Sequence, residues 1–229
     1  MRSERRESAA GAAALRERLR HVYWIGGGSG AGKSTIARRL ADQYGWCLYA
    51  TDEVMSEHAR RTTPDEAPFL HQFMAMDMDE RWVNRSPETM LETFHWFRGE
   101  GFGLIVEDLL RLPPEPCVVV EGFRLLPHLV KPLLAVSSQA VWLLPTPEFR
   151  QGAIQSRATP GEGFIWKTSD PERASRNIAE RDSSFMKRLY EEVKRLDLHA
   201  IEADTAMTED DLARQVTKGF LDRRSTPQG

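Results

Sequence analysis

The segment Gly27 to Thr35 constrains the fold of this chain more than any other, because it reads GGSGAGKST between an apolar run and a helix-like stretch. The spacing of its glycines and of its Lys-Ser pair satisfies the P-loop pattern, in which a glycine-rich turn joins a strand to a helix. We therefore predict a strand over 22–25, followed by this loop and a helix that begins near Lys33.

The residue types of this loop suit the phosphates of a nucleotide. Glycines allow positive φ and carry no Cβ, so successive backbone N–H groups can point at the β- and γ-phosphates, and the following helix adds its positive end. Lys33 supplies a mobile charge and the Ser34 hydroxyl a ligand for Mg²⁺. The alternative is a glycine-rich turn with an accidental lysine, which requires spacing, Lys-Ser pair and both flanks to coincide. The predicted residues for ATP with Mg²⁺ are Gly27, Gly28, Ser29, Gly30, Ala31, Gly32, Lys33, Ser34 and Thr35.

The charge balance argues against a polyanionic partner. The 229 residues carry 31 Lys and Arg against 34 Asp and Glu, a net charge of -3, so no global basic field favours nucleic acid or an anionic membrane. The apolar runs are far shorter than the roughly 20 residues that span a bilayer, and no signal-peptide core follows the N-terminus. We expect a cytoplasmic protein that acts on a small molecule, and the sequence leaves its oligomeric state open.

An acidic residue follows the second predicted strand, WCLYA at 46–50. Ligands bind at the carboxyl ends of strands in open parallel sheets, so Asp52 is expected to project toward the same crevice as the P-loop. One interpretation is that Asp52, or Thr51 before it, caps the helix of DEVMSEHARR. The other is that Asp52 accepts or orients the proton of a substrate hydroxyl facing the γ-phosphate. We favour the second, with Thr51 as the cap.

A second acid ends the run CVVVEG, which has no polar residue before Glu121 and reads as a central parallel strand. Glu121 is the expected place for a Walker B carboxylate that holds the hydration shell of Mg²⁺, so we predict Ser34 and Glu121 as the metal residues. A strand-end acid exposed to water is the alternative. Gly122 is expected to leave room for a phosphate or nucleophile. Arg124 either clamps an anionic group of the substrate or pairs with a surface acid.

The chain length fits one α/β domain with an inserted subdomain. We expect residues 1–20 to be a flexible N-terminal extension, 21–222 to form the domain and 223–229 to be a disordered tail. Residues 62–112 have no clear strand and show helical spacing, which predicts a helical cap over the crevice. Residues 158–176 open with Pro, Gly, Ser and Thr without periodicity and are expected to form a mobile lid.

Three further groups of residues carry expectations. Arg81, Trp82 and Arg85 mix charge with an aromatic ring and are the candidates for substrate contact, although a solvated helix face explains them almost as well. The helix that follows the loop of the lid carries Arg176 and Arg181, which fit closure over a triphosphate. The aromatic residues of the cap are expected to form its core, and the only two cysteines to be reduced core residues: Phe94, Trp96 and Phe97, and Cys47 and Cys117.

Four pieces stand in a fixed order along the chain: GGSGAGKS, YATDEVM, VVVEGFRLLP and RNIAERD. This order resembles the small-molecule kinases of the P-loop superfamily, the group that holds nucleoside monophosphate kinases, uridine kinases and chloramphenicol phosphotransferase-like enzymes. The resemblance implies a three-layer α/β fold, a five-stranded parallel sheet in the order 2-3-1-4-5, a substrate cap and a lid.

The resemblance also implies roles for four residues. Asp52 matches the acid that handles the substrate hydroxyl, Glu121 matches the glutamate of the uridine-kinase EG strand, and Arg176 and Arg181 match lid arginines. No nucleoside-kinase aromatic motif follows Asp52 and no DGxPR segment is present, so the acceptor is not inherited.

The predicted function is ATP- and Mg²⁺-dependent transfer of the γ-phosphoryl group to a hydroxyl, or a phosphate, of a small molecule. The catalytic candidates are Lys33, Asp52, Glu121, Arg176 and Arg181. The alternative is a nucleotide-binding regulatory ATPase whose cap binds a partner. A nucleic-acid kinase is a third interpretation, which the acidic balance disfavours.

Overall fold

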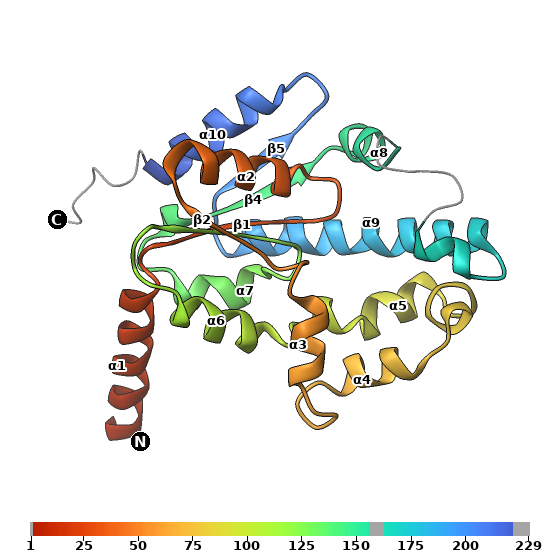
Figure 1. The fold of residues 1–229 in the computed structure, drawn as a ribbon, viewed down its shortest axis with the longest axis horizontal. Coiled ribbons are helices and arrows are strands. Elements are labelled where there is room, and N and C mark those ends of the chain that lie inside the picture. Colours follow the sequence, from red (N-terminus) through yellow and green to blue (C-terminus); the bar gives the residue numbers. More distant parts are fainter. Residues whose placement is uncertain (1, 156–162, 222–229) are drawn as a thin grey trace.

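The sheet lies at the centre of the molecule and has five parallel strands. The computed structural model describes residues 2–155 and 163–221. The strand order is β2-β3-β1-β4-β5, which confirms the predicted fold class (Figure 1). The strands are β1 (Val22–Gly27), β2 (Cys47–Ala50), β3 (Val118–Glu121), β4 (Ala140–Pro145) and β5 (Ala200–Ala203).

Helices cover both faces of the sheet, because the central strands are apolar on both sides. Along β1, Val22 and Trp24 pack in the cluster that includes the lower helices, whereas Tyr23 and Ile25 pack with the upper ones. This alternation follows from the two-residue repeat of a strand. The upper layer holds α2 (Lys33–Tyr44) and α10 (Glu209–Leu221), and the lower layer holds α6 (Phe102–Arg111), α7 (Pro127–Val130) and α9 (Pro171–Arg195) (Figure 1).

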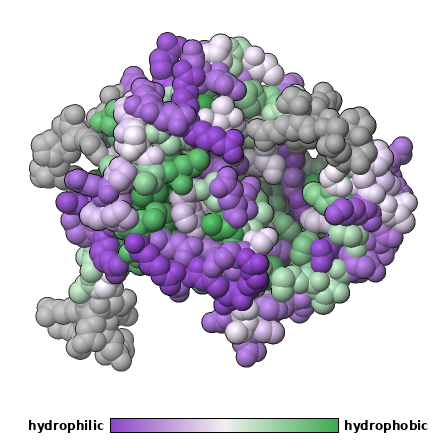
Figure 2. Space-filling model, viewed as in Figure 1, coloured by the Kyte–Doolittle hydropathy of each residue, from purple (hydrophilic) through white to green (hydrophobic). Residues whose placement is uncertain are grey.

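The outer helices present polar residues to solvent. Figure 2 shows hydrophilic residues over α2 and α10 at the top of the view. Within the described part of the chain, no helix is both long and apolar enough to cross a membrane.

A group of short helices forms the cap beside the sheet. Its core cluster contains Trp82, Val83, Phe94 and Trp96, as expected for the cap aromatics. The predicted range 62–112 divides, however, because α6 packs with β3 in the lower layer. The cap elements are α3 (Met55–Arg61), α4 (Pro68–Ala75), the π-helical turn η1 (Glu80–Asn84), α5 (Pro87–Thr93) and the 3₁₀ turn η2 (His95–Arg98).

The remaining elements are short, with one exception at the N-terminus. Residues 2–18 form the helix α1 (Arg2–Arg18), which lies in the segment expected to be flexible. Leu19 after it is buried in the lower cluster, so the sheet holds the carboxyl end of this segment. The others are η3 (Lys131–Leu133), η4 (Ser137–Gln139), α8 (Pro147–Gln155) and η5 (Phe164–Lys167). The expected tail, 223–229, lies outside the described residues.

The expectation for the two cysteines is wrong for Cys47. β2 is an edge strand, and Cys47 is exposed on it, whereas Cys117 is half-buried. Both are free thiols. Leu48 is also 37% exposed, so the apolar run at 46–50 marks an edge strand and not a buried one.

A single buried amide joins the start of the sheet to the loop before β4. The side-chain N–H₂ of Gln139 donates to the carbonyl oxygens of Leu19 at 3.1 Å, Arg20 at 3.0 Å and Val22 at 3.1 Å. Its Oε1 accepts from the backbone N–H groups of Ala135 at 2.7 Å and Val136 at 3.0 Å. The side chain therefore satisfies backbone groups that no strand pairs.

We predict that Gln139→Ala lowers the free energy of unfolding by about 3 kcal/mol, because it leaves several buried backbone groups without a partner. Urea unfolding followed by circular dichroism measures this change. The matched control is Gln215→Ala on the exposed side of α10, which should stay within about 0.5 kcal/mol of the parent protein. Equal unfolding midpoints for both variants would contradict this role for Gln139.

Candidate functional site

Three strand ends meet at the carboxyl edge of the sheet. Glu121, the last residue of β3, pairs in register with Ile25 of β1 on one side and with Ala50 of β2 on the other. The P-loop follows β1 and Thr51-Asp52 follows β2, so parallel pairing brings all three segments to one place. The sequence placed them at strand ends, and the strand order makes them neighbours.

The P-loop has the backbone that its glycines predict. Gly30 and Gly32 adopt φ values of 79° and 80°, and α2 begins at Lys33. A Cβ at Gly28 would overlap the sulfur of Met186 on α9, so the loop packs directly against that helix. The Lys33 ammonium is buried and donates to the Gly28 carbonyl oxygen at 2.8 Å. The charge of Lys33 therefore lies within the loop.

A hydroxyl and a carboxylate meet beside the P-loop. Ser34 Oγ donates to Oε1 of Glu121 at 2.9 Å, and Glu121 is 3% exposed. Burial raises the pKa of the Glu121 carboxyl, while Lys33 and the Ser34 hydroxyl oppose part of that rise. The solvent-exposed alternative for Glu121 is excluded. Two oxygen donors, one of them anionic, make a set that suits Mg²⁺.

The structure corrects the expectation that Thr51 or Asp52 caps a helix. α3 begins at Met55, its N-cap is Val54, and no side chain caps it. Thr51 is fully buried instead, and its backbone N–H donates to the Glu121 carbonyl oxygen at 2.9 Å. The Asp52 carboxylate is free of the capping role that competed with catalysis.

Gly122 serves a different purpose from the one expected. Its φ is 151°, and a Cβ there would overlap the Thr51 side chain. The space that this glycine leaves is filled by Thr51, not by a ligand. This close approach places Thr51 against the end of β3 and thereby positions the backbone of Asp52, the next residue.

Asp52 follows β2 at this edge of the sheet and is exposed to solvent. The protein around it raises the pKa of its carboxyl by burial, an effect that Lys33 and the Thr51 hydroxyl oppose. Asp52 in turn helps to raise the pKa of Glu121. Lys33, Asp52 and Glu121 therefore form one electrostatically coupled group.

Arg124 is neither a surface residue nor an exposed substrate contact. It is 1% exposed, and its guanidinium lies 4.1 Å from the centre of the Trp96 ring. It donates to the carbonyl oxygens of Thr51 at 3.3 Å and Gly101 at 3.1 Å. Burial lowers the pKa of Arg124 to about 10. Arg124 therefore binds backbone oxygens and an aromatic ring, whereas the sequence predicted either a clamp for an anionic substrate group or a pair with a surface acid.

Two other substrate candidates serve the cap itself. Arg81 donates to the carbonyl oxygens of Phe73 at 3.0 Å and Met74 at 2.9 Å, which closes the end of α4. Trp82 is 8% exposed within the cap core. Neither belongs to a solvated helix face, and the contact of either residue with a substrate stays a prediction.

Arg85 and Arg181 are buried arginines at the junction of the cap and α9. Arg181 donates to Asp182 Oδ1 at 2.9 and 2.6 Å and lies over the rings of Trp82, Phe94 and Phe97. Arg85 donates to the Thr93 hydroxyl at 2.9 Å. Among the described residues, Nη1 of Arg181 and Nε of Arg85 have no hydrogen-bond partner.

Sequence reasoning missed Arg150 and Asn177. Arg150 on α8 lies 3.3 Å from the second oxygen of Asp182, so Asp182 is shared by two arginines. Asn177 donates to the carbonyl oxygens of Trp82 at 3.1 Å and Val83 at 3.2 Å and ties α9 to the cap. Both belong to segments that the sequence marked as basic or helical, but only the packed helices show their partners.

The expected lid is described in part. Residues 158–162 lie outside the described residues, and the rest includes η5 and the first turns of α9. Arg176 lies on the exposed side of α9, 4.0 Å from Glu172. It is therefore apart from the buried Arg181.

A small pocket of about 170 Å³ adjoins the P-loop between α2, α8 and the segment after β5. It is lined by Gly32 and Thr35 of the loop and α2, by Phe149 of α8 and by Met207 in the segment after β5. The signal in the sequence is the position of these residues: segments that follow the fourth and fifth strands also lie at the carboxyl edge of the sheet.

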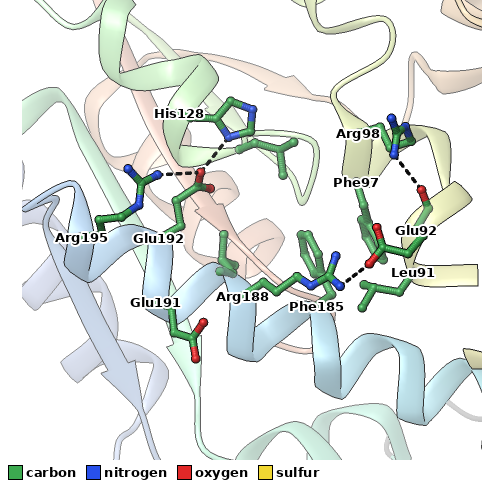
Figure 3. A pocket seen from close by; sticks show the side chains of 12 residues that line it. Leu91, Glu92, Phe97, Arg98, His128, Phe185, Arg188, Glu191, Glu192 and Arg195 are labelled. Atoms are coloured by element: carbon green, nitrogen blue, oxygen red, sulfur yellow. Dashed lines mark hydrogen bonds and ion pairs between the residues drawn. The ribbon is translucent and has the colours of Figure 1, made fainter. Parts of the chain in front are cut away.

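A second, larger pocket lies away from these residues. It has a volume of about 560 Å³ and an apolar floor that includes Phe97 and Phe185 between α5, α7 and α9 (Figure 3). Its charged rim is paired internally: Arg188 with Glu92, and Glu192 with both His128 and Arg195. It contains none of the predicted site residues.

The comparison with protein families gives one match. A family model described as shikimate kinase matches residues 29–67, which hold most of the P-loop, α2, β2 and α3. This match supports an enzyme of the P-loop kinase type. It extends only to the start of the cap, so it leaves the acceptor open. A search of curated proteins finds no match.

Solved structures with a similar course of the chain are distant in sequence. An uncharacterized protein from Eubacterium ventriosum has 16% identity and a TM-score of 0.46, over 88% of this chain and 98% of its own. Deoxyadenosine kinase from M. mycoides, with bound dATP, has 12% identity and a TM-score of 0.45, over 86% and 97%. Shikimate kinase from Acinetobacter baumannii, in complex with shikimate, has 16% identity and a TM-score of 0.42, over 90% and 94%. The roles proposed below rest on this chain's own residues.

We predict that Gly122→Ala destabilises the protein by about 1–3 kcal/mol, because the added methyl group overlaps Thr51 and the backbone keeps a positive φ. Adding Thr51→Ala should recover part of the loss, since it removes the overlapping hydroxyl. The control is Gly103→Ala on α6, where nothing lies within 4 Å of an added Cβ. Additive effects of the two site substitutions in thermal unfolding would contradict the close packing.

Proposed function

We propose that this protein transfers the γ-phosphoryl group of ATP to a hydroxyl, or a phosphate, of a small molecule with the help of Mg²⁺. The observation that carries the proposal is the register of β3, which sets Glu121 between the strand before the P-loop and the strand before Asp52. A nucleotide phosphate, a metal carboxylate and an acceptor-binding acid then share one crevice, as phosphoryl transfer requires.

The nucleotide is proposed to bind from the P-loop to the pocket beside it. The loop N–H groups and the α2 N-terminus hold the β- and γ-phosphates, and Lys33 leaves the Gly28 carbonyl to reach them. The base is proposed to enter the pocket between Thr35, Phe149 and Met207. An aromatic and a thioether side chain there suit the flat face of a purine.

Mg²⁺ is proposed to bind at Ser34 and Glu121. The hydroxyl would serve as a direct ligand, and the carboxylate would hold the ion or its water shell. When bound, the ion neutralises charge on the β- and γ-phosphate oxygens. The hydrogen bond between Ser34 and Glu121 keeps both oxygens together before the ion arrives.

Asp52 is proposed to orient the acceptor hydroxyl and take its proton. The hydroxyl oxygen forms a bond to the γ-phosphorus as the bond to the β-bridging oxygen breaks, and ADP leaves. In a loose transition state positioning matters more than early deprotonation, so a modest base suffices. The raised pKa of Asp52 suits a group that receives a proton late in the step.

The acceptor is proposed to carry an anionic group that Arg85 and Arg181 bind. Buried polar atoms are usually hydrogen-bonded, and one nitrogen of each of these guanidinium groups has no partner among the described residues. His95 beside them is kept neutral, since burial and then the surrounding arginines lower its pKa to about 3. Such an excess of buried positive charge favours an anion. Arg176 is proposed to join this group only if the lid at 158–176 closes.

The test is an ADP-release screen across hydroxylated metabolites, nucleosides and antibiotics, with the rate without acceptor as the baseline. The Lys33→Ala variant subtracts contaminating activity. A kinase gives acceptor-dependent ADP release and an acceptor with one more phosphoryl group in mass spectrometry. Release at one rate with and without every acceptor would instead favour the regulatory ATPase.

We predict that Asp52→Asn lowers kcat for the acceptor by roughly 10² or more, because the amide keeps the shape but cannot take the proton. ATP affinity should change less than about threefold, since the P-loop backbone holds the nucleotide. Steady-state kinetics measure both values. Asp65→Asn, an exposed acid of the cap, is the matched control. Near-parent turnover in Asp52→Asn would remove the catalytic role.

We also predict that Glu121→Gln raises the Mg²⁺ concentration for half-maximal activity by about tenfold or more. The amide oxygen still accepts from Ser34 but no longer carries the charge that attracts the cation. A titration of activity against Mg²⁺ at saturating ATP measures it. Glu107→Gln, on the exposed side of α6, serves as control. An unchanged Mg²⁺ requirement would place the metal elsewhere.

A further inference from the structure

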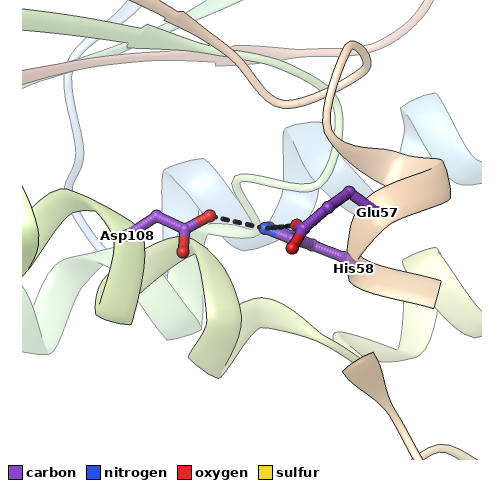
Figure 4. A group of neighbouring side chains, drawn as sticks. All are labelled: Glu57, His58 and Asp108. Carbon is purple, nitrogen blue, oxygen red and sulfur yellow. Dashed lines mark hydrogen bonds and ion pairs between the residues drawn. The ribbon is translucent and has the colours of Figure 1, made fainter. Parts of the chain in front are cut away.

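A buried histidine connects the cap to the segment that carries Asp52. His58 on α3 is fully buried, and its Nε2 lies 2.7 Å from Oδ2 of Asp108 on α6 (Figure 4). Its Nδ1 lies 3.1 Å from Nη2 of Arg124. Both ring nitrogens therefore have a partner, one acidic and one basic.

The two partners determine where the proton of His58 sits. A guanidinium group can only donate, so Nδ1 of His58 must accept from Arg124. The proton of the neutral ring is then on Nε2, which donates to Asp108. Burial lowers the pKa of His58, although Asp108 opposes this, so the ring is neutral at neutral pH.

This proton assignment argues against a metal ion among Glu57, His58 and Asp108, whose ligand atoms lie within 4.8 Å of one another. The nitrogen that faces the two carboxylates carries a proton. Asp108 also accepts from Arg61 at 2.8 Å and from the Tyr49 hydroxyl at 2.8 Å. Burial tends to raise the pKa of Asp108, but these hydrogen bonds lower it to about 2. The carboxylate is already satisfied by cationic and neutral donors.

Arg124 depends on His58 for its orientation. Within the described residues no ion pair with a carboxylate holds its guanidinium, which is fixed by backbone oxygens, the Trp96 face and Nδ1 of His58. Its Nη1 donates to the carbonyl oxygen of Thr51, the residue before Asp52. Burial raises the pKa of Asp52, and the charge of Arg124 opposes part of that rise.

We infer that His58 is a positioning residue that holds Arg124 against Thr51 and thereby sets the place of Asp52. This inference rests on the proposed function of Asp52 for its catalytic meaning, but the contact itself is independent of any acceptor. Asp108 in turn orients His58. Hydrogen bonds therefore connect Asp108 on α6, His58 on α3 and Arg124 with the carboxyl edge of the sheet.

The first experiment needs no substitution. ¹⁵N NMR of the histidine rings of the full-length protein at pH 7.5, assigned with His58→Asn, reports the tautomer of His58. We expect the neutral form with its proton on Nε2. A proton on Nδ1, or a charged ring, would overturn the inference because Nδ1 then cannot accept from Arg124.

The second experiment separates the two bonds of His58. In His58→Asn the amide oxygen takes the place of Nδ1 and keeps the acceptor for Arg124, whereas the link to Asp108 is lost. In His58→Gln the amide reaches the Nε2 position and Asp108, but no acceptor remains at the Nδ1 position. Both variants lose the histidine charge at low pH, so their comparison is matched.

The readout is the titration midpoint of the Asp52 carboxyl by ¹³C NMR, assigned with Asp52→Asn. A displaced Arg124 no longer favours the carboxylate form, so the midpoint should rise by about half a pH unit or more in His58→Gln. It should stay within about 0.2 units of the parent in His58→Asn. Besides Arg124, the groups that face His58 are Tyr49, Glu57 and Asp108, and they are common to both variants.

Equal midpoints in the two variants would overturn the inference. Failure of the proposed function has a different signature, because Asp52→Asn would then keep near-parent turnover whatever the midpoints show. Where an acceptor is known from the screen, His58→Gln should lower kcat about tenfold with the KM for ATP unchanged, since Arg124 does not touch the nucleotide site.

Discussion

Parallel pairing of β3 with β1 and β2 is the constraint on which the site depends. A parallel strand presents its last residue at the same edge as its neighbours, so Glu121 lies beside the segments that follow Ile25 and Ala50. Lys33 and Ser34, Asp52, and Glu121 come from three separate segments of the chain and nevertheless share one electrostatic environment. Apolar clusters pack on both faces of these strands.

Two glycines allow close packing at this edge of the sheet because they have no Cβ. Gly28 lets Met186 of α9 lie against the P-loop, and Gly122 lets Thr51 lie against the end of β3. In each case the absent Cβ lets another segment come into contact, and that segment holds a residue with a proposed role: Arg181 on α9, and Asp52 after Thr51. The glycines of this site therefore shape protein contacts as well as ligand contacts.

Two buried arginines lie against aromatic rings of the cap core. Arg124 lies on Trp96, and Arg181 lies over three rings while it shares Asp182 with Arg150. Burying positive charge in this way is unfavourable unless donors find acceptors. Part of the donor capacity is met by the protein, as between Arg124 and His58, and part is proposed to await an anionic acceptor.

The sequence by itself determined the P-loop, the apolar strands and the acids at their ends, because those signals are local: glycine spacing, apolar runs and the residue after each run. It could not decide which arginines are buried and which groups they contact. Arg81, Arg85 and Arg124 were all candidates for substrate contact, and Arg181 was a candidate lid arginine. Only the packing of α3, α4 and α9 shows their partners. It also missed that Thr51 caps nothing and that His58 joins Asp108 to Arg124, since these contacts join residues of separate elements. Neighbouring residues in the sequence determine motifs and the ends of strands. Burial and hydrogen-bond partners depend on elements that meet only when the chain has folded.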